Sequence, residues 1–198
     1  MQTLLDNLKK RGFIPVLLQD GEQAAQYILQ HIPAGATVGF GGSVTVEQLQ
    51  IPTLLERGGL KCNSTKTSQL SWEQLCLENR HAEYYITSTN AISREGILVN
   101  IDGRSNRISA MCYGPRELFF VLGTNKITKT LGEAINRAQN VAAPLNAKRL
   151  NRKTPCVKTG KCSDCLSPDT ICKAMLVLYH PTSTVKTHII IINKELGY

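Results

Sequence analysis

Four of the seven cysteines fall within 17 positions near the end of the sequence and form the pattern C-x5-C-x2-C-x6-C. Thiolate sulfur binds both zinc and iron, and two cysteines separated by two residues can hold one ion or one edge of a cluster. The spacing is neither that of bacterial ferredoxins nor that of zinc fingers, so zinc and a [4Fe–4S] cluster are both candidates. The predicted metal ligands are Cys156, Cys162, Cys165 and Cys172.

Two other interpretations of these cysteines stay open. Cys162 and Cys165 can form a redox-active dithiol, or all four thiols can pack under a loop as small apolar groups. Metal binding is favoured because residues 146–167 are rich in Lys, Thr, Ser and Gly and have little apolar surface to bury. Ligation would supply the free energy that orders such a segment.

Basic residues surround the cysteines. The chain has a net charge of +8, and residues 147–173 carry seven Lys and Arg against two Asp. We expect these cations to offset the negative charge of a thiolate-bound centre and to favour thiolates over thiols. The same segment has no Phe, Tyr or Trp. Because single-stranded nucleic acid binds by stacking its bases on aromatic rings, the composition argues against a nucleic-acid partner.

A glycine-rich turn at Gly41, Gly42 and Ser43 joins a short apolar run to an amphipathic stretch. Glycines let the backbone approach a ligand closely, and free N–H groups at a helix start favour anions, so this turn is a candidate phosphate or carboxylate contact. Its spacing matches neither the dinucleotide fingerprint nor the P-loop, and no nicotinamide or flavin signature is present. A plain strand-to-helix turn capped by Ser43 or Thr45 explains the pattern equally well.

A second group of polar residues lies at the ends of predicted strands, where α/β proteins place ligand contacts. Lys126 follows Gly-Thr-Asn after an apolar run, where its ammonium can hold an anion or act as an acid or base; a solvated loop lysine is the alternative. Asp102 is the candidate catalytic partner, although Asp and Asn are also common in turns. The other predicted ligand-binding residues are Thr87, Asn90, Asn100, Asn106, Arg107 and Asn125.

Helices and short strands must position these residues. Capping residues and apolar residues at helical spacing predict helices over 21–31, 71–81 and 131–142. The last of these helices should end at Pro144. Short apolar runs predict buried strands over 36–40, 84–87 and 118–122.

Two further pairs of segments suggest antiparallel strands. Residues 97–101 and 107–111 flank several turn residues, and residues 174–179 and 187–192 suggest a terminal β-hairpin across 181–186. Together with the alternating helices and strands, these pairs indicate an α/β fold with a mostly parallel sheet and some antiparallel additions.

Several short segments, in this order, resemble the LUD (lactate utilisation) domain family over essentially the whole chain. They are GFGGS, TSTNAIS, LVNIDGRSNR, GTNKIT, TPCVKTGKCSDCLSPDTIC and the final ELGY. The resemblance implies a single domain over residues 1–198 with a Rossmann-like fold related to the sugar-isomerase and CoA-transferase group. The cysteine-rich segment, about 154–173, is similar to that of the lactate utilisation protein C group. Such proteins act beside iron–sulfur partner proteins.

The expected function is therefore a redox-associated component of the utilisation of lactate or another small hydroxy or keto acid. One alternative is a regulatory module that binds an anionic metabolite or nucleotide and carries a structural zinc. Another is an enzyme of the sugar-phosphate isomerase type that uses Lys126 and Asp102. Apolar runs of about five residues are too short to cross a bilayer, and the N-terminus lacks a signal-peptide pattern. We expect a cytoplasmic protein without a membrane partner; its oligomeric state is not predicted.

Overall fold

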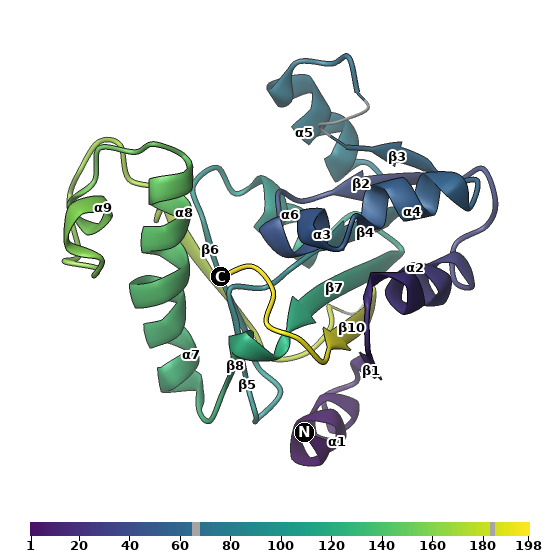
Figure 1. The fold of residues 1–198 in the computed structure, drawn as a ribbon, viewed down its shortest axis with the longest axis horizontal. Helices are drawn as coiled ribbons and strands as arrows, with labels where there is room; N and C mark the ends of the chain where they lie inside the picture. The colour runs from purple at the N-terminus through teal and green to yellow at the C-terminus, as the bar shows by residue number, and fades with distance from the viewer. Residues whose placement is uncertain (65–67, 183–184) are drawn as a thin grey trace.

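Two β-sheets form the centre of the molecule (Figure 1). The computed structural model describes residues 1–64, 68–182 and 185–198. The strands of the first sheet are β1 (Ile14–Leu18), β2 (Thr37–Phe40), β3 (Lys61–Asn63), β4 (Tyr84–Thr87), β7 (Glu117–Gly123) and β10 (Lys186–Ile192). They are all parallel and lie in the order β1-β10-β7-β4-β2-β3. The strands of the second, mixed sheet are, in spatial order, β8 (Ile127–Thr128), β5 (Ala91–Ser93), β6 (Leu98–Asp102) and β9 (Ala174–Leu178).

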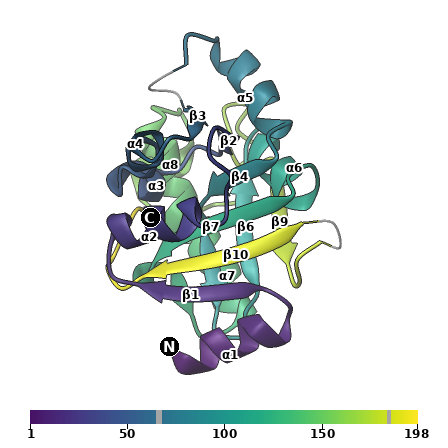
Figure 2. The ribbon, with the colours of Figure 1, turned by 90° about the vertical axis from the view of Figure 1, so that its right-hand side faces the viewer.

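Helices cover both sheets and give the molecule its layers. The helices are α1 (Gln2–Lys10), α2 (Gly21–Leu29), α3 (Val44–Gln48), α4 (Ile51–Arg57), α5 (Trp72–Arg80), α6 (Asn106–Cys112), α7 (Leu131–Arg137), α8 (Ala143–Arg149) and α9 (Pro155–Thr159), with the 3-10 turn η1 (Thr124–Lys126) and the π-helical turn η2 (Ala138–Ala142). One face of the six-stranded sheet packs against α2, α3 and α4, and the other packs against α1, α6 and the second sheet. The far face of the second sheet packs against α7 and η2 (Figures 1 and 2).

The predicted α/β class with a mostly parallel sheet is confirmed, and local signals placed several elements correctly. The Asp20 carboxylate accepts a hydrogen bond from the N–H of Gln23 and begins α2. Ser71 and Gln74 form a reciprocal capping box at the start of α5. The apolar run in β7 is buried from Leu118 onward because helices or the second sheet cover both faces of this strand.

The predicted terminal hairpin is wrong. β9 pairs antiparallel with β6 in the second sheet, whereas β10 lies between β1 and β7 in the first. Positions 183 and 184 of the predicted turn lie outside the described residues. The physical reason is burial: β10 is buried from Thr187 to Ile192, which is typical of a central parallel strand, whereas β9 is only partly buried.

The predicted strand over residues 107–111 is also wrong, because this segment forms α6. The carboxylate of Asp102 accepts hydrogen bonds from the backbone N–H groups of Arg104, Ser105 and Arg107. An aspartate that satisfies these otherwise unpaired N–H groups favours a helix start over a hairpin turn. The strand before it, β6, pairs instead with β5 and β9.

Pro144 does not end the third predicted helix, and strand β1 was not predicted. The π-helical turn η2 precedes Pro144, and α8 continues to Arg149. A proline lacks the N–H of an α-helical hydrogen bond and clashes with the carbonyl four residues earlier, and the wider turn accommodates both effects. Strand β1 contains Pro15, which is tolerated because β1 lies at an edge of the sheet.

His188 lies in a buried polar cluster at the opposite end of the sheet from the cleft described below. It is 0% exposed, and its ring nitrogens lie 2.8 Å from the Tyr27 hydroxyl and 3.0 Å from a Glu117 carboxylate oxygen. Burial, followed by the nearby His31, lowers the pKa of His188 to about 4, although Glu117 opposes the shift. The folded protein therefore holds this imidazole in its neutral form at neutral pH.

This pKa gives a pH dependence with a definite sign. Between about pH 6.5, the ordinary histidine value, and about pH 4, the unfolded chain binds more protons at His188 than the folded chain. The stability due to neutral His188 should be fully present above about pH 6.5 and lost as the pH falls toward 4. Urea unfolding measures the free energy of unfolding at pH 7.5 and at pH 5. Between these two pH values it should fall by more in the wild type than in His188→Leu, and equal falls would contradict the assignment.

Candidate functional site

A cleft of about 690 Å³ lies at the carboxyl ends of the strands of the first sheet. Because β2, β4 and β7 are parallel neighbours, their carboxyl ends meet at one edge of the sheet. The segments that follow them contribute Gly42 and Ser43, then residues 88–90, then Lys126. Residues of α8 and the C-terminal residue Tyr198 also line the cleft. Figure 1 shows α8 and the C-terminus on the side of the sheet toward which β7 points. Open α/β sheets bind their ligands at this edge.

The glycine turn is shaped by close packing against the neighbouring strand. A Cβ atom on Gly41 would lie 2.6 Å from the Thr87 hydroxyl and 2.9 Å from the Tyr85 hydroxyl, so only glycine fits there. The hydroxyl of Ser43 accepts a hydrogen bond from the N–H of Val46 and caps α3. Gly42 has open space beside its Cα and forms part of the cleft wall. The segment thus forms the strand-to-helix turn that the sequence suggested, and Gly42 and Ser43 of this turn line the cleft.

Lys126 is the buried cation of the cleft, with only 4% of its surface exposed. Its Nζ donates hydrogen bonds to the Ser88 hydroxyl, 3.0 Å away, and to the Thr89 carbonyl, 3.1 Å away. Burial, followed by the guanidinium groups of Arg137 and Arg107, lowers the pKa of Lys126 to about 7. The amine is therefore partly unprotonated near neutral pH, unlike a solvated loop lysine.

Asp102 and Arg107 lie in the cleft wall and are already partnered with the protein. One oxygen of Asp102 accepts hydrogen bonds from two backbone N–H groups, and the other lies 3.4 Å from the Nε of Arg107. The Arg107 guanidinium also donates to the Ile101 carbonyl. Asp102 acts here as a structural acceptor that starts α6.

The structure brings together some predicted ligand residues and separates others. Those that line the cleft are Gly42, Ser43, Asn90, Asp102, Asn106, Arg107 and Lys126. Thr87 and Gly41 are buried behind the wall. Asn125 accepts a hydrogen bond from the N–H of Leu196 and holds the C-terminal residues. The Asn100 side chain is fully buried, and its polar atoms have no hydrogen-bond partner among the described residues.

Sequence reasoning missed the wall that α8 and the C-terminal residues provide. Asn146, Arg149 and Tyr198 line the cleft, and the Tyr198 hydroxyl donates to the Asn146 side chain and accepts from Arg149. Arg152 and Lys173 also face it. The signal was the basic segment 147–173, which was interpreted only as a counter-charge for the cysteines. Three basic residues of this segment, Arg149, Arg152 and Lys173, line the cleft.

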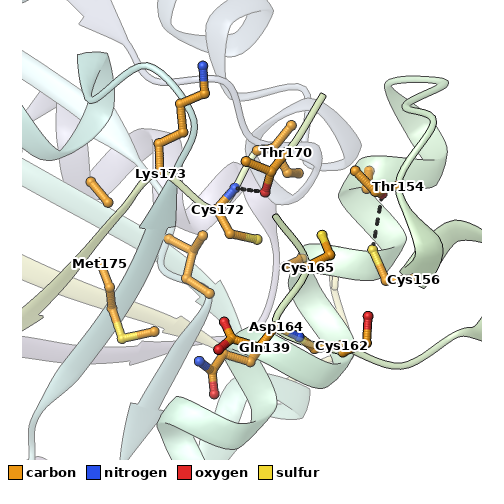
Figure 3. Close-up of a pocket in the computed structure, with 16 residues that line it drawn as sticks. Gln139, Thr154, Cys156, Cys162, Asp164, Cys165, Thr170, Cys172, Lys173 and Met175 are labelled. Atoms are coloured by element: carbon orange, nitrogen blue, oxygen red, sulfur yellow. Dashed lines mark hydrogen bonds between the residues drawn. The ribbon is translucent and has the colours of Figure 1, made fainter. Parts of the chain in front are cut away.

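The four predicted cysteine ligands line one cavity of about 180 Å³ (Figure 3). Cys156 lies on α9, Cys162 and Cys165 lie in the following loop, and Cys172 precedes β9. Within residues 1–64, 68–182 and 185–198, no three His, Cys, Asp or Glu side chains are close enough to hold one metal ion as they stand. The four thiols thus share a cavity, and the loop must draw them closer before they can share an ion.

Backbone hydrogen bonds and burial define the local environment of these thiols. The N–H of Cys162 donates to the Asn140 side chain, and the N–H of Asp164 donates to the Cys162 sulfur. Burial, followed by the proximity of Cys162, raises the pKa of the Cys172 thiol, although a hydrogen bond with Thr170 opposes the shift. A metal ion would reverse this preference because it binds the thiolate. Cysteine sulfur is a donor that binds zinc and iron, and the four thiols, all within the described part of the chain, share one cavity, but as they stand they do not form a metal site.

The cysteine cavity and the cleft are neighbours. Ile101, Thr170, Ile171 and Lys173 line both of them. The loop that carries Cys172 therefore forms a wall between a potential metal centre and a potential anion site. The sequence offered no signal for this contact, because Lys126 and Cys172 lie far apart along the chain.

A parallel sheet with a cationic cleft at the carboxyl ends of its strands defines a Rossmann-like α/β protein. The profile of the LUD domain matches residues 1–192, so the chain belongs to the LUD domain family, which is implicated in lactate utilisation. A crystal structure of a DUF162 family protein from Deinococcus radiodurans is similar, with a TM-score of 0.52, 15% sequence identity and coverage of 96% of this chain and 94% of that chain. No curated protein matches the sequence. Within the described residues, no helix is long and apolar enough to cross a membrane.

Proposed function

We infer that the protein is a redox-associated component of the utilisation of lactate or another small hydroxy or keto acid, as expected of the lactate utilisation protein C group. The cleft would bind the anionic acid, and Cys156, Cys162, Cys165 and Cys172 would hold a [4Fe–4S] cluster or a metal ion. The observation that carries this proposal is the shared wall between the cleft and the cysteine cavity. A metal centre in the cysteine cavity and an organic acid in the cleft would be separated only by the residues that line both, so the charge of one would affect the binding of the other.

The charges of the cleft favour a small anion. Six basic side chains and three acidic ones line it. Two of the acids are engaged: Asp102 pairs with Arg107, and Asp169 pairs with Arg152 at 3.1 Å. The cleft therefore keeps an excess of positive charge, and a carboxylate entering it gains charge-assisted hydrogen bonds. Lys126, Arg149 and the backbone near Gly42 are the proposed contacts.

The cysteine cavity would supply electron transfer if it held an iron–sulfur cluster. Iron–sulfur proteins are the proposed partners, since this chain would need a donor or acceptor for those electrons. Zinc would instead order the loop without redox chemistry. That alternative, a metabolite-binding regulatory module with a structural zinc, is supported by the composition of residues 151–173, in which only Thr154 is buried.

The isomerase alternative has weaker support. To act as an acid or base, Asp102 would need a carboxyl group that is free to face the substrate, whereas both of its oxygens accept hydrogen bonds from the backbone at the start of α6. Glu47 also lines the cleft, but no contact ties it to Lys126.

Spectroscopy of protein purified without oxygen tests the proposal. We expect a broad absorption band at about 400 nm and, after reduction, an electron paramagnetic resonance signal from a cluster. Calorimetric titration of the same protein with lactate, pyruvate and phosphate should show binding of at least one small acid. A colourless protein with one zinc per chain would favour the regulatory alternative, and a metal-free protein that binds none of these anions would contradict both.

A further inference from the structure

The two hydrogen-bond acceptors around Lys126 match in number the N–H bonds of an unprotonated amine. Its Nζ donates to two acceptors, the Ser88 hydroxyl and the Thr89 carbonyl, and a neutral amine has two N–H bonds to donate. An ammonium would carry a third N–H. No carboxylate lies within ion-pair distance of Nζ among the residues that the structure describes. Both N–H bonds of the neutral form are thus satisfied, and its lone pair is not engaged by either acceptor.

The charged groups that face Lys126 act in the same direction. Arg137 reaches it from α7 and Arg107 from α6, and both guanidinium groups disfavour a second cation beside them. Arg107 is held by Asp102, and Arg137 donates to the carbonyls of Asn125 and Asn90, so neither side chain is free to turn away. With burial as the largest cause, these groups bring the pKa of Lys126 to about 7.

We propose that Lys126 forms a Schiff base with the carbonyl carbon of a 2-oxo acid bound in the cleft. The proposal rests on the proposed function, in which the cleft binds a small keto acid. It adds a covalent step that a hydroxy acid cannot undergo, because a hydroxy acid has no carbonyl carbon for the amine to attack. The cleft would therefore distinguish the oxidised from the reduced acid by chemistry as well as by shape.

The step balances without an oxidant or a reductant. The lone pair of Nζ forms a bond to the carbonyl carbon, and the carbonyl oxygen takes one proton from the amine. A second proton, from solvent in the open cleft, converts that hydroxyl into water, which leaves as the C=N bond forms. The product is one iminium cation and one water molecule. Lys126 lines the cleft, through which water can reach the site and leave it.

The surroundings of Lys126 suit both the reactant and the product. Ser88 is a positioning residue, because its hydroxyl holds the amine at 3.0 Å from within the cleft wall. The carboxylate of a 2-oxo acid is bonded to the reacting carbon, so it stays beside the nitrogen after the iminium forms. The two opposite charges then attract each other beside a side chain that is itself almost fully buried. Arg107 and Arg149 line the same cleft and would hold the carboxylate.

Reductive trapping tests the proposal on the full metal-loaded protein. Pyruvate and sodium borohydride should produce about one stable adduct per chain, which is detected by intact mass and located by peptide mapping. We expect the adduct on Lys126 in the wild type, so the result does not depend on whether a variant folds. Lactate with borohydride should give no adduct. Lys126→Arg should lose the adduct, whereas Lys129→Arg, at an exposed lysine three residues away, should keep it.

The pH profile separates Lys126 from surface lysines. At pH 7, about half of an amine with this pKa is unprotonated, compared with about one part in 2,500 of an ordinary lysine. The adduct yield should therefore rise through about pH 7 rather than about pH 10. An adduct confined to other lysines would overturn the proposal.

Calorimetry in parallel distinguishes this inference from the proposed function. If pyruvate binds but leaves no adduct on Lys126, the Schiff base is wrong and the anion-binding function stands. If neither pyruvate nor lactate binds and no adduct forms, both are wrong.

Discussion

Replacing Cys162 and Cys165 together with Ser will remove the metal that we propose for the cysteine cavity, while the two sheets stay folded. A serine hydroxyl is a poor ligand for zinc or iron at neutral pH, and two thiolates cannot complete a four-ligand site. The sheets should survive because, between residues 151 and 173, only Thr154 is buried, so the loop contributes almost nothing to the apolar clusters. Metal analysis should fall from one centre per chain to nearly none.

Hydrogen exchange shows which part of the double variant loses order. Amide exchange over residues 154–172 should become faster in the double variant, while exchange in β7 and β10 stays slow, because ligation orders only the loop. The matched control is Cys76→Ser with Cys112→Ser, since both of these half-buried thiols lie outside the cysteine cavity. Full metal content in the Cys162 and Cys165 variant would show that the four-cysteine assignment is wrong.

Local sequence signals predicted the elements whose burial is simple. The capping residues of α2 and α5 act within one helical turn, and the continuous apolar run of β7 reflects cover on both faces. The wrong predictions concern segments whose strand pairing depends on contacts with distant parts of the chain. A hairpin and two separated strands have the same local pattern, and only the partner strands show that β9 and β10 belong to different sheets.

The site was predictable to the extent that sheet geometry determines it. The rule that parallel strands end at one edge correctly placed Gly42, Asn90 and Lys126 around one cleft. No such rule brings Arg149 or Tyr198 there, because their positions depend on how α8 and the C-terminal residues fold back over the sheet. The same limit concealed the wall that the cleft shares with the cysteine cavity.

Asp102 shows a different limit. A carboxylate at a strand end next to basic residues fits a catalytic role on sequence alone, yet its oxygens bind three backbone N–H groups at the start of α6. Turn chemistry and catalysis select the same residue types, and only the hydrogen bonds separate them. Lys126 is the opposite case, because its burial and lowered pKa distinguish it from the solvated lysine of the competing interpretation.

Replacing Lys126 with Ala will weaken the binding of lactate, which cannot form a Schiff base, by roughly ten- to a hundredfold. Loss of one charge-assisted hydrogen bond costs about 1.5 to 3 kcal/mol. Lys126→Met keeps most of the buried stem without the charge, so equal losses in both variants would assign the effect to the nitrogen. Metal content should not change, because Lys126 does not line the cysteine cavity. Calorimetric titration measures each affinity.

The pH dependence of this affinity gives the same nitrogen a second signature. Lactate is fully ionised above about pH 5, so any change near neutral pH reports on the protein. The pKa of Lys126 is about 7 in the free protein, so well below that pH the side chain is already an ammonium that can contact lactate. Above that pH, the amine must first take up a proton before it can make this contact. Wild-type affinity should therefore fall by up to about tenfold per pH unit above 7, and the fall should be absent in Lys126→Met. If lactate binds the wild type and both variants equally at every pH, Lys126 is not its charged contact, and the anion must be held by Arg107 and Arg149 alone.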